Sequence, residues 1–300
     1  MLEPMIAVDH LTKRYGSQLA VDDISFVCEP GTVTGFLGPN GAGKSTTLRM
    51  ICGLTPPSAG TTAVLDRPYR NLDNPGRRVG VLLDASAQHS GRTGREVLAV
   101  SAQVLGVAPS KVGELLDLVG LDKQAAKKRV GQYSLGMRQR LGIAHALLGD
   151  PSVLILDEPA NGLDPEGIYW MRGLLRDFAD RAGTVLLSSH LLGEVEAVAD
   201  QLLVIGRGKL VAQGAKHELL SAAGVIVRAL DTTALHEALA EAGLTATPGA
   251  DGALLVEAQA EDVGRIAAAN GIVLLELRPA DTGGLERLFL SLTREEALVA

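Results

Sequence analysis

The chain has 300 residues, of which 46% are hydrophobic and 21% are charged, values typical of a globular protein with a sizeable core. Its formal net charge of −7 argues against a nucleic-acid partner and against a broadly cationic membrane-binding face. The two cysteines, Cys28 and Cys52, have no C-x-x-C or His neighbours, which disfavours a disulfide framework or a zinc site and suits a reducing cytoplasm.

The sequence shows neither a membrane span nor a signal peptide. None of its apolar stretches approaches the ~20 residues that span a bilayer. Residues 1–5 lack the basic start and apolar core of a secretory signal. We therefore expect any contact with a membrane to come through a partner protein.

The first predicted elements are strands. Residues 5–30 carry apolar residues on both sides of a polar stretch at 12–17, which predicts two strands joined by a turn. The short apolar run at 33–37 predicts a buried strand, and residues 46–52 predict the first turns of a helix.

A glycine-rich loop lies between this strand and this helix. It fits the pattern G-x-x-x-x-G-K-[S/T] of a phosphate-binding loop and consists of Gly38, Pro39, Asn40, Gly41, Ala42, Gly43, Lys44, Ser45 and Thr46. Glycines let the backbone approach a polyphosphate closely, so that amide N–H groups point at the anion. In such a loop Lys44 reaches the β- and γ-phosphates and the Ser45 hydroxyl binds Mg²⁺. The alternative, a chance match in a Gly-rich turn, is disfavoured by the flanking strand and helix.

The following residues, up to 221, alternate strands and helices. Apolar runs that predict strands lie at 61–65, 79–83, 153–157, 184–188, 201–205 and 209–213. Helical periodicity lies at 94–150, 168–182 and 191–199. This order predicts an α/β domain over residues 1–221 with an all-helical insert at about 90–150.

A change in composition near residues 221–224 marks a second domain. The pattern that follows is β-α-β-β-α-β, with strands at 225–230, 244–247, 253–256 and 272–278 and helices at 232–242 and 261–270. This is the split-βαβ order of a ferredoxin-like unit, so residues 222–300 predict a small α+β domain. A last helix is predicted at 285–292.

Two acids end the apolar run at 153–157. A carboxylate at the tip of a strand beside a phosphate-binding loop can hold Mg²⁺, and Asp157 suits that role. Glu158 projects one residue further and could polarise an attacking water molecule. The alternative is that both are solvated acids at a strand end, which the phosphate-binding loop disfavours.

The set and order of these motifs resembles the nucleotide-binding subunit of an ABC (ATP-binding cassette) transporter, a P-loop NTPase. The segment at 133–140 resembles the family signature, usually L-S-G-G-Q, which opens a helix. Leu135 and Met137 replace the commoner glycine and glutamine of that signature, whereas Ser134 and Gly136 match it. The resemblance implies that Ser134 and Gly136 face the γ-phosphate of an ATP held by the other subunit of a homodimer. Taken alone, the segment also suits a serine N-cap of an amphipathic helix.

Three further matches carry the resemblance. The segment 160–164, ending in Asp164, matches the loop that runs along the dimer interface of the family. His190 matches the histidine that contacts the γ-phosphate and positions water against Glu158. Tyr15 lies where the family has an aromatic residue that stacks on adenine.

One position departs from the family pattern. The family has Gln directly after the strand at 79–83, whereas this chain has Asp84, and Gln88 has the wrong spacing. Asp84 could still reach the metal through its carboxylate. The sequence therefore leaves two questions about Asp84 undecided, namely whether it coordinates the metal and how this position couples to a permease.

The resemblance implies an ATPase that uses ATP and Mg²⁺. Its partner would be a separately encoded transmembrane permease, and its place the cytoplasmic face of the cell membrane. Closure of the homodimer on ATP would drive transport, and the tail from about residue 225 resembles extensions found in drug-exporting systems. The alternatives are a soluble cassette ATPase without a transport role and an importer subunit. A P-loop kinase or GTPase is disfavoured by the segment at Ser134, by His190 and by the absence of N-K-x-D.

Overall fold

The computed structural model describes residues 5–221, 224–249 and 252–280. The chain divides after Gln213 into two compact units, earlier than the predicted boundary after residue 221. Among the described helices, none has the length and apolarity needed to cross a membrane. The helix predicted at 285–292 lies outside the described residues.

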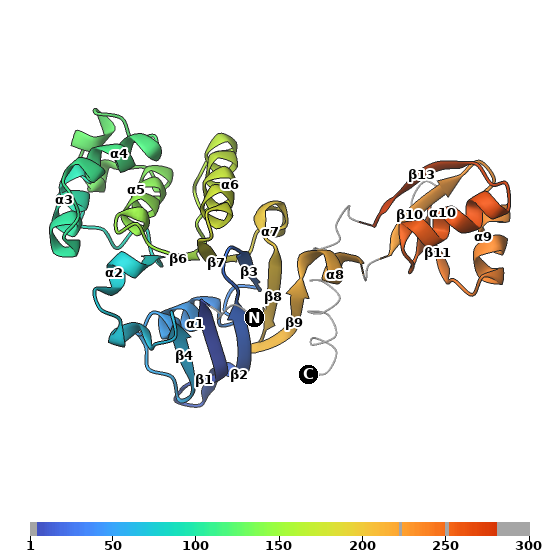
Figure 1. Cartoon of the computed structure of the whole chain (residues 1–300), viewed down its shortest axis with the longest axis horizontal. Coiled ribbons are helices and arrows are strands. Elements are labelled where there is room, and N and C mark those ends of the chain that lie inside the picture. The colour runs from blue at the N-terminus through green and yellow to red at the C-terminus, as the bar shows by residue number, and fades with distance from the viewer. Residues whose placement is uncertain (1–4, 222–223, 250–251, 281–300) are drawn as a thin grey trace. The chain divides into compact units, whose positions relative to one another are not determined.

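The first unit is built on a mainly parallel sheet (Figure 1). Its six strands lie in the order β5-β6-β7-β3-β8-β9. They are β3 (Val33–Leu37), β5 (Val79–Leu82), β6 (Val153–Asp157), β7 (Thr184–Ser189), β8 (Gln201–Gly206) and β9 (Lys209–Ala215). All five residues of β3 are buried, and so are the first four of β6, as expected for parallel strands covered on both faces.

A smaller antiparallel sheet has the strand order β2-β1-β4. It contains β1 (Ile6–Tyr15), β2 (Gln18–Cys28) and β4 (Ala59–Val64). The polar stretch at 12–17, predicted as a turn, is for the most part the continuation of β1, because its backbone pairs with β2 as far as Tyr15. One buried cluster joins this sheet to helix α1 (Lys44–Ile51) and to the parallel sheet.

Helices cover the parallel sheet and form the predicted helical insert (Figure 1). The insert contains α3 (Gly94–Leu105), α4 (Ser110–Leu118) and α5 (Leu135–Leu147). The other helices of this unit are α2 (Pro75–Arg78), α6 (Pro165–Asp180) and α7 (Leu192–Val198). Helices α4 and α5 bury apolar side chains, including those of Leu115, Leu116, Leu141 and Ile143.

The second unit has the predicted β-α-β-β-α-β order. After α8 (Lys216–Ser221) come β10 (Val225–Ala229), α9 (Thr232–Glu241), β11 (Ala246–Pro248), β12 (Leu254–Val256), α10 (Ala260–Ala269) and β13 (Leu274–Pro279). The strand order β11-β12-β10-β13, with every neighbouring pair antiparallel, is that of a ferredoxin-like unit. Its core joins alternate residues of β10 and β12 to one face of α9 and of α10.

Candidate functional site

Three neighbouring parallel strands end at the same edge of the large sheet. Leu37 at the end of β3 pairs with Ser189 of β7, and Asp157 at the end of β6 pairs with Ser188 of β7. The chain therefore leaves all three strands side by side, and the segments that follow carry the phosphate-binding loop, Glu158 and His190. Parallel register alone brings these three distant parts of the sequence together.

The glycine-rich loop and the start of α1 line a cavity of about 370 Å³. Gly43, which precedes the helix, has φ 111°, a conformation that L-residues rarely adopt, and a Cβ there would lie 2.5 Å from the carbonyl oxygen of Ala20. The lining residues are Tyr15, Gln18, Ala20, Pro39, Asn40, Gly41, Gly43, Lys44, Ser45, Thr46 and Glu158. Most of the predicted loop residues thus meet at one cavity together with Tyr15 and Glu158.

Lys44 is the buried cation of this cavity, with a side chain that is 6% exposed. Its ammonium donates a hydrogen bond of 2.6 Å to the carbonyl oxygen of Gly38 and lies 3.7 Å from a carboxylate oxygen of Glu158. Burial lowers the pKa of Lys44, and the negative charge of Glu158 opposes that effect. The loop holds the lysine in place with its own carbonyls, while Ala42 closes the turn through an N–H bond of 3.2 Å to Pro39.

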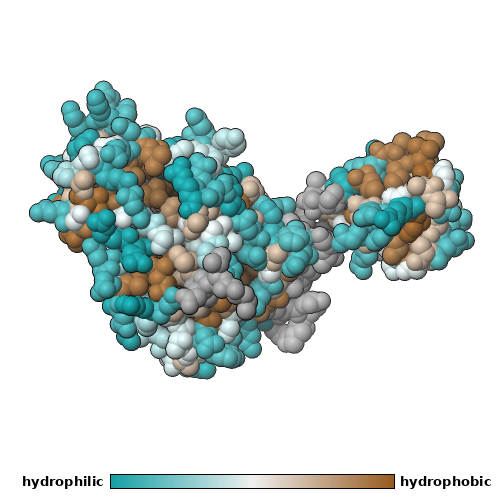
Figure 2. Space-filling model, in the orientation of Figure 1, coloured by the Kyte–Doolittle hydropathy of each residue, from teal (hydrophilic) through white to brown (hydrophobic). Residues whose placement is uncertain are grey.

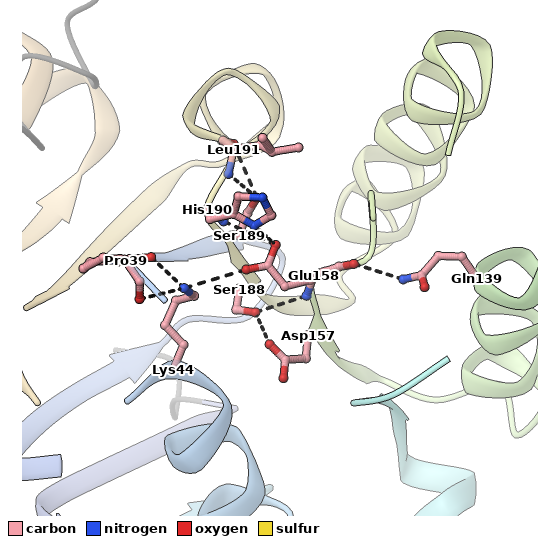
Figure 3. Close-up of polar contacts among 10 residues, drawn as sticks. Pro39, Lys44, Gln139, Asp157, Glu158, Ser188, Ser189, His190 and Leu191 are labelled. Atoms are coloured by element: carbon pink, nitrogen blue, oxygen red, sulfur yellow. Dashed lines mark hydrogen bonds and ion pairs between the residues drawn. The ribbon is translucent and has the colours of Figure 1, made fainter. Parts of the chain in front are cut away.

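Glu158 lies between Lys44 and His190 (Figure 3). Its φ of 49° is left-handed, which turns the chain away from β6. One carboxylate oxygen faces Lys44, and the other lies 2.7 Å from Nδ1 of His190. The acid predicted to polarise water is therefore in direct contact with His190, the histidine that the resemblance places at the γ-phosphate.

Ser188 holds both acids of the pair. Its hydroxyl donates to the carboxylate of Asp157 and accepts a bond of 3.1 Å from the backbone N–H of Glu158. Ser188 lies near the end of β7, between β6 and β3, and is fully buried. The orientation of Asp157 at the tip of β6 thus depends on a side chain of the neighbouring strand.

Tyr15 ends β1 and offers an exposed ring to the cavity. The residue is 49% exposed, and the ammonium of Lys13 lies 4.9 Å from the centre of its ring. One face of the ring is thus occupied by a cation. The remaining aromatic surface is suited to stacking against a base.

Ser134, Gly136 and Asp164 lie outside the lining of this cavity. The Ser134 hydroxyl caps α5 because it accepts a hydrogen bond of 3.2 Å from the backbone N–H of Met137. The Asp164 carboxylate caps α6 in the same way, through a bond of 3.0 Å from the backbone N–H of Gly167. A Cβ on Gly136 would lie 2.6 Å from the carbonyl oxygen of Gly162, so the two segments pack closely. The structure therefore joins the signature segment to the segment at Asp164, apart from the phosphate-binding loop of the same chain.

Asp84 also lies outside the lining of the cavity. Its carboxylate accepts bonds of 2.6 Å and 2.7 Å from the hydroxyl and the backbone N–H of Ser86. These bonds hold the pKa of Asp84 below its usual value, most of all the one from the Ser86 hydroxyl. Gln88 instead donates to the carbonyl oxygen of Arg138 on α5, over 3.4 Å. A role of Asp84 in metal binding stays a prediction.

Two polar residues of the site, Ser188 and Gln139, were not predicted from the sequence. Gln139, on α5, donates a hydrogen bond of 3.1 Å to the carbonyl oxygen of Glu158 (Figure 3). The position of Ser188 two residues before His190 was a usable signal. Gln139 lies in the segment that resembles the signature, but its contact with Glu158 depends on how α5 packs on the end of β6, which the sequence pattern does not show.

Family models match both parts of the chain. The family model described as "ABC transporter" matches residues 21–161, which include the phosphate-binding loop, the signature segment and the paired acids. A second family model, described as a domain of unknown function, matches residues 223–286.

Named relatives match about the same length of this chain. The bacitracin transport ATP-binding protein BcrA of Bacillus licheniformis is 43% identical over 213 residues, 70% of this chain and 69% of that protein. The Nod factor export ATP-binding protein I of Burkholderia lata is 40% identical over 224 residues, 72% of this chain and 73% of that protein.

Solved structures give the same result for the fold. An ATP-binding subunit of an ABC transporter matches with a TM-score of 0.65 and 27% identity over 72% of this chain and 91% of that one. A dimeric ATP-binding cassette bound to ADP and Pi has the same TM-score, with 21% identity over 70% of this chain and 98% of that one. The relatives, the family model and the site together establish that the chain belongs to the ABC transporter family, as one of its ATP-binding, ATP-hydrolysing subunits.

Proposed function

We propose that this chain powers an exporter by hydrolysing ATP with Mg²⁺, as a homodimer docked to a separately encoded permease at the cytoplasmic face of the membrane. The observation that carries the proposal is the position of the Glu158 carboxylate, with one oxygen 3.7 Å from Lys44 and the other 2.7 Å from His190, at a cavity lined by the phosphate-binding loop.

The cavity suits a nucleoside triphosphate. The N–H groups of the loop and of the first turn of α1 would bind the phosphates, with Lys44 adding a positive charge. Tyr15, at the same cavity, would stack on adenine. In the structure the Lys44 ammonium donates hydrogen bonds to carbonyl oxygens of the loop. When a triphosphate binds, these bonds would be replaced by bonds to phosphate oxygens.

The chemistry assigned to Glu158 is general-base catalysis. A water molecule attacks the γ-phosphorus, the bond from that phosphorus to the bridging oxygen of ADP breaks, and the water proton passes to the Glu158 carboxylate. His190 orients the carboxylate through Nδ1 and its backbone N–H, which lies 3.3 Å from the same oxygen. The left-handed backbone at Glu158 directs its side chain into the cavity rather than along β6.

The oxygen donors at the sheet edge fit Mg²⁺. Within the described residues no group of three or more His, Cys, Asp or Glu side chains could hold a metal by itself. Mg²⁺ is commonly bound by one or two carboxylates together with substrate phosphates. The Ser45 hydroxyl and the Asp157 carboxylate would hold the ion, directly or through water, and it would neutralise phosphate charge. Asp84 is a further candidate ligand.

The signature segment supports a head-to-tail homodimer. Ser134, Gly136 and Asp164 do not line the cavity of their own chain. Leu135, which lies between Ser134 and Gly136, is 47% exposed. A second copy that places this segment against the γ-phosphate would complete each site. A cassette of the same fold among the similar structures is a dimer.

A groove beside α3 is proposed to receive the permease. It has a volume of about 260 Å³ and is lined by residues of β5, α3 and α5, including the apolar side chains of Val79, Val81, Val100, Val104 and Leu105. Val104 is 78% exposed, and Figure 2 shows apolar surface over this helical region. Exposed apolar patches of this kind commonly mark interaction sites. The direction of transport is suggested by the relatives. One is named for bacitracin transport and the other for Nod factor export, and these names favour an exporter.

The test compares the wild-type chain with Glu158→Gln. We expect the substitution to lower ATP turnover by about 100-fold or more, since removing a general base costs roughly that much. ATP should still bind, and the inactive variant should accumulate as a dimer in ATP but not in ADP during analytical ultracentrifugation. A variant that turns over ATP at the wild-type rate would contradict the role of Glu158. The proposed docking to a permease is tested by co-purification of the chain with a membrane protein. The substitution Val104→Asp in the groove should weaken that co-purification.

A further inference from the structure

Gln139 is a buried polar side chain that contacts the backbone of the proposed general base. The residue is 3% exposed and lies on α5, five positions after Ser134. Its amide Nε2 donates to the carbonyl oxygen of Glu158 over 3.1 Å (Figure 3). A buried amide placed in this way fixes the peptide group that it binds.

The backbone of Glu158 needs such support. Its φ of 49° is unusual for a residue with a side chain and is strained unless the surroundings compensate. The N–H of Glu158 is held by the carbonyl and hydroxyl oxygens of Ser188, at 3.2 Å and 3.1 Å. The carbonyl is held by Gln139 and by the N–H of Asn161, also at 3.1 Å. Helix α5 therefore supplies a side-chain bond to a peptide group that orients the carboxylate.

The start of α5 is also fixed to the residues that follow Glu158. Gly136 lies so close to Gly162 that a Cβ on Gly136 would be 2.6 Å from the carbonyl oxygen of Gly162. The guanidinium of Arg140 lies 3.9 Å from the carboxylate of Asp164. With Gln139 between these two contacts, a shift of α5 would be passed to the segment that begins at Glu158.

We propose that Gln139 is a positioning residue that couples the signature segment of a chain to the Glu158 carboxylate of the same chain. The inference rests on the proposed dimer. There, the signature segment contacts the ATP of the partner subunit, whereas Glu158 acts on the ATP of its own chain. Binding of ATP at one site would then set the position of the base at the other.

Substitution of Gln139 separates this role from a general effect on folding. Gln139→Glu keeps the shape but replaces the donor with an acceptor, and Gln139→Leu removes the polar group. Because about one hydrogen bond is lost, we expect kcat to fall about tenfold or more while the Kd for ATP changes less than twofold. Gln103→Leu, at an exposed glutamine of α3, is the matched control and should leave kcat within twofold. A Gln139 variant that loses ATP affinity and kcat equally would contradict a positioning role.

Mixed dimers test whether the coupling acts within a chain. A dimer with Lys44→Ala in one subunit and Ser134→Arg in the other has one complete site. The Ser134→Arg chain supplies the phosphate-binding loop and Glu158 of that site, and the Lys44→Ala chain supplies the signature segment. We expect Gln139→Glu in that chain to lower activity at least about fivefold more than the same change in the Lys44→Ala chain. Equal losses, or a larger loss in the Lys44→Ala chain, would overturn the inference. If the pair is inactive before Gln139 is changed, an ATP-dependent cysteine crosslink across the interface in the Glu158→Gln variant decides whether the proposed dimer fails. In that case kcat of the single Gln139 variants still decides whether Gln139 positions the base.

Discussion

Nδ1 of His190 lies 2.7 Å from a carboxylate oxygen of Glu158, although the two residues are 32 positions apart. The contact follows from the register of β6 and β7, in which Asp157 pairs with Ser188. Each residue follows its strand directly, so the sheet edge sets their separation. The chemistry of the site is therefore built on rigid strands, with only the side chains free to adjust.

Loss of His190 should slow hydrolysis without preventing ATP binding. His190→Ala removes the bond that orients the Glu158 carboxylate, and we expect turnover to fall about 100-fold, as is common when an acid–base group is misplaced. The Kd for ATP should change less than about tenfold, because the phosphate-binding loop is intact. His236→Ala, at an exposed histidine of α9, is the control. Turnover within twofold of wild type in His190→Ala would show that the contact is not used.

A methyl group on Gly136 should be costly, in contrast to one on Gly113. A Cβ at Gly136 would lie 2.6 Å from the backbone oxygen of Gly162, which cannot move like a flexible side chain. We expect Gly136→Ala to lower the free energy of unfolding by about 1–3 kcal/mol. A Cβ at Gly113, in α4, would meet nothing within 4 Å, so Gly113→Ala should raise it by up to about 1 kcal/mol. Urea unfolding of the two variants measures both values, and equal effects would contradict the close packing of α5.

The pKa of Asp84 should depend on Ser86. The hydroxyl and N–H of Ser86 stabilise the ionised carboxylate and lower its pKa, so Ser86→Ala should raise that pKa towards its ordinary value. A lowered folded-state pKa stabilises the protein above the unfolded-state pKa, and this contribution is lost as the pH falls through the folded-state value. The stability difference between Ser86→Ala and wild type should therefore shrink in acid.

An NMR titration of the Asp84 carboxyl group measures the shift directly. Ser90→Ala, at the next serine of the chain, provides the control. An identical Asp84 pKa in wild type and Ser86→Ala would show that the hydroxyl does not stabilise the carboxylate in solution.

The second unit should be dispensable for nucleotide binding. Every residue that lines the proposed ATP cavity precedes Gln213, where the first unit ends. A chain that stops after Ser221 should bind ATP with a Kd within about tenfold of that of the full chain. Isothermal titration calorimetry measures this Kd, and circular dichroism checks that the shortened chain folds. A folded fragment that no longer binds ATP would place part of the site in the second unit.

The motifs predicted the site because they sit at the ends of parallel strands. A glycine-rich loop between a strand and a helix, and paired acids after an apolar run, have few structural solutions, and both lie where they were expected. The ferredoxin-like order of the second unit was also predictable from its alternating pattern.

Contacts that depend on tertiary packing were not predictable. The burial of Gln139 depends on how α5 meets the end of β6, which no periodicity in α5 reveals. The extension of β1 through a polar stretch depends on pairing with β2 and β4. In contrast, the bond from Ser86 to Asp84 is local, and the Asp-x-Ser spacing could have indicated it.

The central claim is that Lys44 and Ser134 act on one ATP from two different chains. Lys44→Ala removes a charge from the phosphates, and Ser134→Arg blocks the signature segment, so each variant alone should be nearly inactive. In a mixed dimer, one site receives both defects and the other receives neither. Random pairing makes about half of the dimers mixed, each with one intact site of two.

The direct measurement is the ATPase activity of an equimolar mixture of the two inactive variants after subunit exchange. The proposed dimer predicts recovery to roughly a quarter of the wild-type activity if the two sites work independently. If both sites must act together, recovery is absent but ATP still increases a cysteine crosslink across the interface in the Glu158→Gln variant. The absence of both recovery and ATP-dependent crosslinking would contradict the head-to-tail dimer.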